Sequence, residues 1–172
     1  QNEPGIPAHI ADLGDDVCSL LVETRAASEE SLAKYIKLIA DSMAAFALAA
    51  PVTFTDVEAE YAALWKIRKG ILPSVGAMRT PGDTCIIEDV AVPMEHLADA
   101  ALTLQQLFVK HGYTEGVIFG HARDGNLHFL FSQNCGEARE VERYAAFMDD
   151  ICRAVAETYG GSLKAEHGTG RN

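Results

Sequence analysis

The sequence predicts an α+β protein in which helices pack on one face of an antiparallel sheet. Two observations predict this class. Apolar stretches with the period of a strand alternate with amphipathic stretches with the period of a helix. Two of the predicted strands also follow each other across a short hairpin, with no helix between them. Because this combination is typical of ferredoxin-like units, we expect a ferredoxin-like fold, single or duplicated, with residues 1–172 forming one domain.

The first half of the chain is expected to begin with a strand and to continue into a helix capped by Ser28. Glu29 and Glu30 would then occupy the first turn of that helix, where acidic side chains are favourable. The full set expected here is a strand at Val17–Thr24, a helix from Ser28 to about Ala50, a strand at Val52–Thr55, a helix from Asp56 to about Lys69, and a Gly- and Pro-rich loop to Asp83.

The second half carries stronger signals. Pro93 is suited to open a helix and Gly112 to close it. The elements expected here are a strand at Thr84–Val92, a helix from Pro93 to Gly112, strands at Gly116–Gly120 and Leu127–Phe131, a helix at Ala138–Tyr159, and a last strand at Ser162–Ala165.

Composition restricts the function. The 172 residues are 48% hydrophobic and 23% charged, as in an ordinary globular protein, and the net charge of -11 argues against a nucleic-acid partner. Neither a secretion signal nor a membrane span is recognisable, so we expect a cytoplasmic protein, free or peripheral on the inner face of the membrane. The four cysteines, Cys18, Cys85, Cys135 and Cys152, show no CxxC spacing and are expected to be reduced, buried and inert. The chain stops at GTGRN, within a glycine-rich run, which suggests a piece of a longer protein.

The segment GHARDGNLHF contains two histidines on either side of a predicted turn. We expect Gly125 and Asn126 to turn tightly and to bring His121 and His128 to the same end of the sheet. Two such histidines can chelate a divalent metal if the strand register places both rings on one face. The alternative is that one histidine only caps a strand.

The last segment, GGSLKAEHGTGRN, places Glu166 next to His167. In an extended backbone these side chains point to opposite sides, so one could join the histidines as a carboxylate ligand while the other acts as an acid or base. The alternative is an exposed loop without a function.

Three basic residues are candidates for binding an anionic substrate. Arg68 falls on the apolar stripe of its predicted helix, where a guanidinium needs a negative partner and could hold a carboxylate in bidentate geometry. Alternatively, Arg68 extends past Trp65 to solvent. Arg79 and Lys164 are weaker candidates.

Taken together, GHARDGNLHF, LKAEHGTGR and LWKIRKG resemble the C-terminal domain of FAD-linked oxidases related to vanillyl-alcohol oxidase, a group that includes D-lactate, glycolate and D-2-hydroxyglutarate dehydrogenases. The resemblance runs from about Leu64 to the end of the chain. The stretches IIEDVAVP and SVGAMR are most similar to long bacterial members that add an iron–sulfur region after this domain.

The resemblance implies a role for each matching residue. It implies that His121, His128 and Glu166 are ligands of a divalent metal, usually zinc, and that His167 takes the hydroxyl proton. It implies that Arg68 binds the carboxylate of a small 2-hydroxy acid. The FAD would be held mainly by another domain of the parent chain, and an electron acceptor would follow it, so this piece alone is expected to be inactive.

The sequence departs from that pattern at two positions. The hydroxyglutarate enzymes have a lysine where this chain has Ile87, and a polar residue where it has Leu130. The acid therefore stays open, with Arg79 or Lys164 as substitutes. Two other classes also remain open, namely a zinc hydrolase that uses the same His/His/Glu set and a non-catalytic ligand-binding module.

Overall fold

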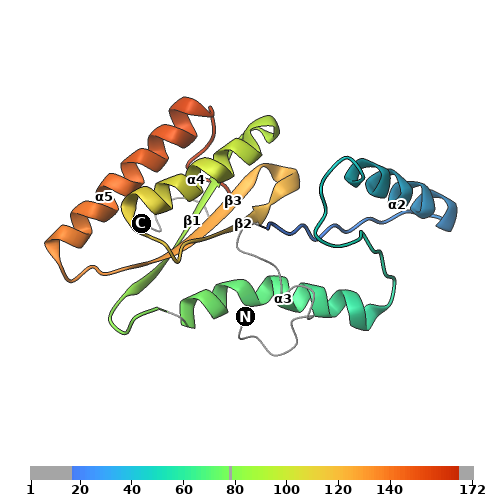
Figure 1. Cartoon of the computed structure of the whole chain (residues 1–172), viewed down its shortest axis with the longest axis horizontal. Helices are drawn as coiled ribbons and strands as arrows, with labels where there is room; N and C mark the ends of the chain where they lie inside the picture. The colour runs from blue at the N-terminus through green and yellow to red at the C-terminus, as the bar shows by residue number, and fades with distance from the viewer. Residues whose placement is uncertain (1–16, 78, 167–172) are drawn as a thin grey trace. The chain divides into compact units, whose positions relative to one another are not determined.

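The computed structural model describes residues 17–77 and 79–166 (Figure 1). The chain falls into two compact units, Gln1–Ile71 and Leu72–Asn172, and each is described by itself. The prediction that the whole chain forms one domain stays a prediction.

The first unit contains the helix that the sequence predicts after Ser28. Helix α2 spans Glu29–Met43, and the Ser28 hydroxyl accepts a hydrogen bond of 3.2 Å from the Ser31 N–H, as an N-cap should. The prediction that this helix reaches Ala50 is wrong. Phe46 is 65% exposed and Leu48 43%. A further apolar turn with its side chains in water gains little from packing, which supplies most of a helix's stability.

The predicted strands Val17–Thr24 and Val52–Thr55 are wrong, because neither segment pairs with another strand in the described part of the chain. Their β-branched and aliphatic residues favour an extended backbone, but a strand also needs a partner. The described residues of the first unit therefore form no sheet and give no support to a duplicated ferredoxin-like fold.

Helix α3 spans Glu58–Ala77 and includes the boundary between the two units. The sequence predicts an end near Lys69 and a loop beyond it, and this is wrong for residues 70–77. Pro73 removes only one intrahelical hydrogen bond, the one that its own N–H would have donated, and the helix continues through it.

The second unit has the order β1 (Thr84–Ala91), α4 (Leu97–His111), β2 (Val117–His121), β3 (Asn126–Gln133) and α5 (Ala138–Cys152). A short 3-10 helix, η1 (Met94–His96), precedes α4, and a π-helical stretch, η3 (Arg153–Thr158), continues α5. The helix predicted from Pro93 to Gly112 is thereby confirmed, with Gly112 in the left-handed conformation that ends α4.

The sheet of this unit has the order β1-β3-β2, and β3 is antiparallel to both neighbours. Helix α4 connects β1 to β2, and β3 lies between them, which is the split β-α-β arrangement of ferredoxin-like folds. The fourth strand of such a fold is reduced here to a single antiparallel bridge between Ser162 and Ala91. The α+β class is confirmed, and the predicted strand at Ser162–Ala165 is wrong beyond this bridge.

The core of the second unit lies between the sheet and the helices α4 and α5, which lie side by side (Figure 1). Its centre is aromatic: Phe147 of α5 is fully buried and stacks on Phe108 of α4 at a centroid distance of 5.5 Å. From β3, alternate residues enter this core, namely Leu127, Phe129 and Phe131. The residues between them therefore face the other side of the sheet.

The cysteines are free in the described structure, as expected, but the prediction that all four are buried is wrong. Cys18 and Cys135 are exposed, and Cys85 and Cys152 are half-buried. Cys135 lies in the connection after β3 and Cys18 in a segment without regular structure, so neither has a core to enter.

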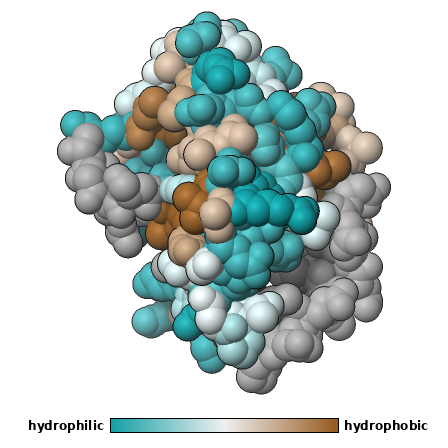
Figure 2. Space-filling view, turned by 90° about the vertical axis from the view of Figure 1, so that its left-hand side faces the viewer, coloured by the Kyte–Doolittle hydropathy of each residue, from teal (hydrophilic) through white to brown (hydrophobic). Residues whose placement is uncertain are grey.

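No helix among the described residues is long and apolar enough to cross a membrane. On the face shown in Figure 2, the coloured residues are mostly hydrophilic, with apolar patches between them.

Candidate metal centre

The register of the β2–β3 hairpin places both histidines on the same face of the sheet. His121 is opposite Asn126, and Phe119 is opposite His128. Residues that are opposite each other in a sheet project to the same side, so His121 and His128 share the face that is turned away from α4 and α5. Their rings are perpendicular, with centroids 5.3 Å apart.

The loop between the two strands spans residues 122–125 and is shorter than the predicted connection, residues 121–126. A turn of 3-10 helix at Ala122–Asp124 is followed by Gly125 at φ 63°, and Asn126 already belongs to β3. The predicted tight turn at Gly125-Asn126 is therefore wrong, although the hairpin itself is confirmed. Gly125 closely approaches the backbone just after β1, because a Cβ built there would lie 2.1 Å from the Val92 carbonyl oxygen. Its own carbonyl accepts a hydrogen bond of 2.9 Å from the Val92 N–H.

The segment after α5 brings Glu166 to this face from the opposite edge of the sheet. Ser162 and Ala91 exchange two backbone hydrogen bonds, of 2.7 and 3.0 Å, at the free edge of β1. The Ser162 hydroxyl then donates to the Lys164 carbonyl and accepts from the Lys164 N–H, which bends the chain. Four residues after the bridge, the Glu166 carboxylate reaches back to the histidines.

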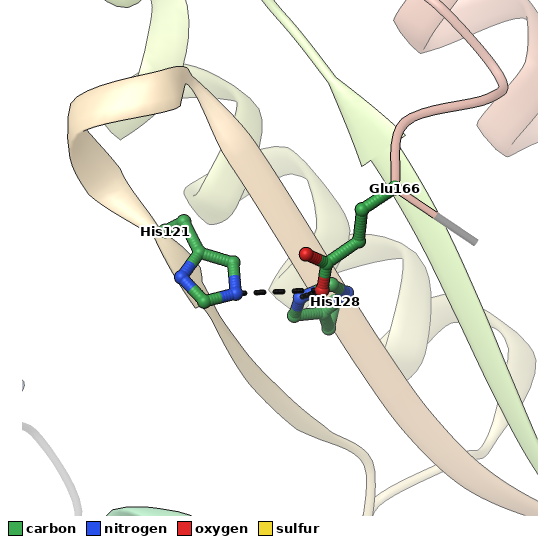
Figure 3. A group of neighbouring side chains, drawn as sticks. All are labelled: His121, His128 and Glu166. Carbon is green, nitrogen blue, oxygen red and sulfur yellow. Dashed lines mark ion pairs between the residues drawn. The ribbon is translucent and has the colours of Figure 1, made fainter.

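The three side chains converge on one point (Figure 3). Glu166 Oε1 lies 2.9 Å from His128 Nε2 and 3.4 Å from His121 Nε2, and the candidate ligand atoms all lie within 4.8 Å of one another. Metal bonds of about 2.0–2.1 Å at the tetrahedral angle place neighbouring ligand atoms about 3.3–3.4 Å apart. Two imidazole nitrogens and one carboxylate oxygen at these separations fit a divalent ion such as zinc, and they leave coordination positions open.

The three donors differ in how they are held. The His128 side chain is only 3% exposed, whereas His121 and Glu166 are 48% and 52% exposed. The other ring nitrogen of His128, Nδ1, lies 3.1 Å from Oδ1 of Asp89 on β1. Oδ1 also accepts a hydrogen bond of 2.6 Å from the Asn126 side chain. His128 is therefore the buried member of the set, with a charged partner behind it.

Asp89 and Asn126 belong to the surroundings of the site, and sequence reasoning missed both. Asp89 is 6% exposed and Asn126 5%. The predicted strand Thr84–Val92 carries two adjacent carboxylates, Glu88 and Asp89, and this is a signal that could have indicated Asp89, because a buried charge requires a partner. The sequence predicts Asn126 in the turn, so it does not indicate that this side chain is buried beside Asp89.

The predicted substrate-binding residues lie on separate segments of the chain. Arg68 is half-buried on α3, and its neighbours on the predicted apolar stripe, Tyr61 and Trp65, are 42% and 38% exposed. Arg79 is exposed and donates to the Gly76 carbonyl at 2.6 Å. Lys164 is exposed on the segment that carries Glu166. His167, the predicted base, lies outside the described residues.

The second unit is an α+β domain in which three possible metal donors meet on one face of the sheet, and comparison with known proteins shows its family. Residues 7–172 match the family described as FAD linked oxidases, C-terminal domain. The chain belongs to this family, and the predicted resemblance is confirmed.

Individual relatives show the same relationship. The chain is 32% identical to a D-lactate dehydrogenase of Anaerostipes hadrus over 83% of its own length and 29% of that protein. It is 30% identical to glycolate oxidase subunit GlcD of Bacillus subtilis over 71% of its length and 25% of that protein. Over 49% of its length and 8% of that protein, it is 36% identical to a D-2-hydroxyglutarate dehydrogenase of Pantoea ananatis. The chain therefore spans less than a third of these relatives.

Proposed function

We propose that this chain is the metal-holding and substrate-binding part of an FAD-dependent dehydrogenase that oxidises a small 2-hydroxy acid to the 2-oxo acid. The observation that carries the proposal is the convergence of His121, His128 and Glu166 on one face of the sheet. The family supports the flavin chemistry, and the relatives' names supply the candidate acids: D-lactate, glycolate and D-2-hydroxyglutarate.

The donor set suits a catalytic metal better than a structural one. Structural zinc sites are usually closed by four protein ligands, whereas catalytic sites keep a position open. When bound, a divalent ion would lower the pKa of the substrate's 2-hydroxyl, and FAD would accept the hydride from C2. His121, His128 and Glu166 would leave room for the hydroxyl and a carboxylate oxygen of the substrate, and this would fix the orientation of C2.

Two further residues have proposed roles by resemblance to the family. His167 would remove the hydroxyl proton as a general base. Arg68 would hold the substrate carboxylate, for which its planar guanidinium is better suited than an ammonium. The FAD-binding domain, an electron acceptor and an iron–sulfur region of the parent protein are part of the same proposal.

The test uses the full-length parent protein with its flavin. Glu166→Gln keeps the size of the side chain but removes its charge, and we expect kcat/KM for the preferred acid to fall at least about 100-fold while the flavin absorbance is unchanged. Glu142→Gln is the matched control, because Glu142 is an exposed carboxylate on α5 and should leave turnover unchanged.

Full activity of the Glu166→Gln protein would contradict the metal role. A parent protein without flavin absorbance that hydrolyses a substrate would favour the zinc hydrolase instead.

A further inference from the structure

We propose that Asp89 is a positioning residue of the metal site. Asp89 holds His128 in the orientation and tautomer that metal binding requires, and Asn126 holds the Asp89 carboxylate in place. This inference rests on the proposed metal site and adds two residues to it. Neither residue reaches the three donor atoms from the open side. Asp89 acts on the Nδ1 side of the His128 ring, away from Glu166, and Asn126 acts through Asp89.

The first part of the argument is the geometry around the His128 ring. Nε2 faces Glu166 Oε1 at 2.9 Å, and Nδ1 faces Asp89 Oδ1 at 3.1 Å. A neutral imidazole carries one proton, and only the nitrogen without it can bind a metal. Each carboxylate attracts the ring proton to the nitrogen beside it, Asp89 to Nδ1 and Glu166 to Nε2. A divalent ion held by Nε2 would displace the proton from that nitrogen, and Asp89 would then stabilise the proton on Nδ1. In this tautomer the lone pair of Nε2 would be available to the ion.

The second part is how firmly Asp89 is held. The Asn126 amide donates 2.6 Å to Asp89 Oδ1 and 3.0 Å to the Val90 carbonyl, so it ties the carboxylate to the backbone of its own strand. The antiparallel register supports this arrangement, since Asp89 is directly opposite His128 and Ala91 directly opposite Asn126. All three polar side chains belong to residues that are at most 6% exposed.

The third part is the contrast with the other donors. Among the described residues, the only carboxylate within 4 Å of His121 is Glu166 itself, and His121 is half exposed. His121 and Glu166 can therefore adjust to an incoming ion, whereas His128 is fixed beforehand. A carboxylate behind a metal-binding histidine orients the ring and raises its basicity, and its loss typically weakens binding 10- to 100-fold.

The experiment measures zinc affinity and tautomer on the 172-residue chain. Asp89→Asn keeps the shape of the side chain and allows its oxygen to accept from Asn126, but it removes the charge. We expect zinc affinity, measured by competition with a chromophoric chelator, to fall 10- to 100-fold. In the metal-free protein at pH 8, the ¹⁵N shifts of the His128 ring should move towards the tautomer with the proton on Nε2, because only Glu166 then remains to attract it. A purely structural role would leave these shifts unchanged.

Two variants complete the test. Asp124→Asn removes an exposed acidic charge from the same hairpin and should keep the wild-type affinity, which controls for the general loss of negative charge. Asn126→Ser leaves Asp89 charged but less well held, and we expect a smaller loss in the same direction. If circular dichroism shows that the Asp89→Asn protein does not fold, the Asn126→Ser variant replaces it as the test.

The outcomes separate this inference from the proposed function. If wild type binds zinc and Asp89→Asn, or in its place Asn126→Ser, binds it equally well with an unchanged His128 tautomer, the role of Asp89 is refuted and the metal site stands. If wild type binds no zinc, both proposals are overturned.

Discussion

Replacing Gly125 by alanine tests how the hairpin holds the two histidines. Gly125 adopts φ 63° between η2 and β3. A residue with a Cβ loses about 1–2 kcal/mol in this left-handed conformation. In addition, the Cβ would lie 2.1 Å from the Val92 carbonyl oxygen, a backbone atom that cannot rotate away. Ordinary van der Waals contact begins at 3.4 Å, about 1.3 Å more, so the loop must move away from Val92.

That movement breaks the hydrogen bond from the Val92 N–H to the Gly125 carbonyl, whose net value is about 1 kcal/mol. The sum predicts that Gly125→Ala lowers the free energy of unfolding by about 2–3 kcal/mol. Because His121 precedes this loop directly and His128 follows it after two strand residues, we also expect zinc affinity to fall at least about 10-fold.

Gly160→Ala is the matched control. Gly160 has nearly the same backbone conformation, φ 60°, but nothing lies within 4 Å of a Cβ built there. It should therefore show only the conformational part, about 1–2 kcal/mol. Urea denaturation of both variants measures the difference. Equal losses at the two positions would show that the close approach to Val92 does not require glycine, and the reasoning about the hairpin would fail.

Two further predictions concern an ion-pair cluster and the substrate. Hydrogen bonds from Lys110, the larger cause, and from His111 lower the pKa of Asp150 from 3.8 to about 2. The Asp150 carboxylate should therefore stabilise the fold above about pH 4, and this stabilisation should be lost as the pH falls through 2. Asp150→Asn should therefore lower the free energy of unfolding by about 1 kcal/mol at pH 6, as for a mostly solvent-screened pair, and thermal melts should find no difference from wild type below pH 2; a difference that persists there would contradict the assignment. In the full-length enzyme, Arg68→Lys should lower kcat/KM for 2-hydroxy acids about 10- to 100-fold with an unchanged flavin spectrum, because an ammonium cannot form the bidentate contact. An unchanged kcat/KM would leave Arg79 or Lys164 as the residue that binds the substrate carboxylate.

The second unit was largely predictable from its sequence because its local signals agree with its packing. Thr84–Ala91 is a mainly apolar run of strand length, Gly112 ends α4 as predicted, and the hairpin follows from the two apolar runs around HARDGN. Each of these signals depends on residues close together in the chain, so no long-range information is needed.

The first unit was less predictable, because the strand signals there depend on partners. Val17–Thr24 has the composition of a strand, but no strand pairs with it in the described structure. After Lys69 the opposite error occurs: the sequence predicts a loop rich in Gly and Pro, but α3 continues through Pro73. In both cases, local preference was insufficient to decide between two backbone conformations.

The candidate site was predictable only in part. Motif resemblance indicated His121, His128 and Glu166, but their convergence depends on the strand register and on the Ala91–Ser162 bridge, which the sequence does not reveal. Asp89 lies 39 residues before His128, and its contact is a consequence of β1–β3 pairing.

The most direct test of the central claim is crystallographic, with anomalous scattering measured at the zinc absorption edge on crystals of this chain grown or soaked with Zn²⁺. The account predicts one strong anomalous peak within about 2.0–2.2 Å of His121 Nε2, His128 Nε2 and a Glu166 carboxylate oxygen. A fully occupied zinc ion elsewhere, with these three atoms unligated and their positions accessible to solvent, would contradict it.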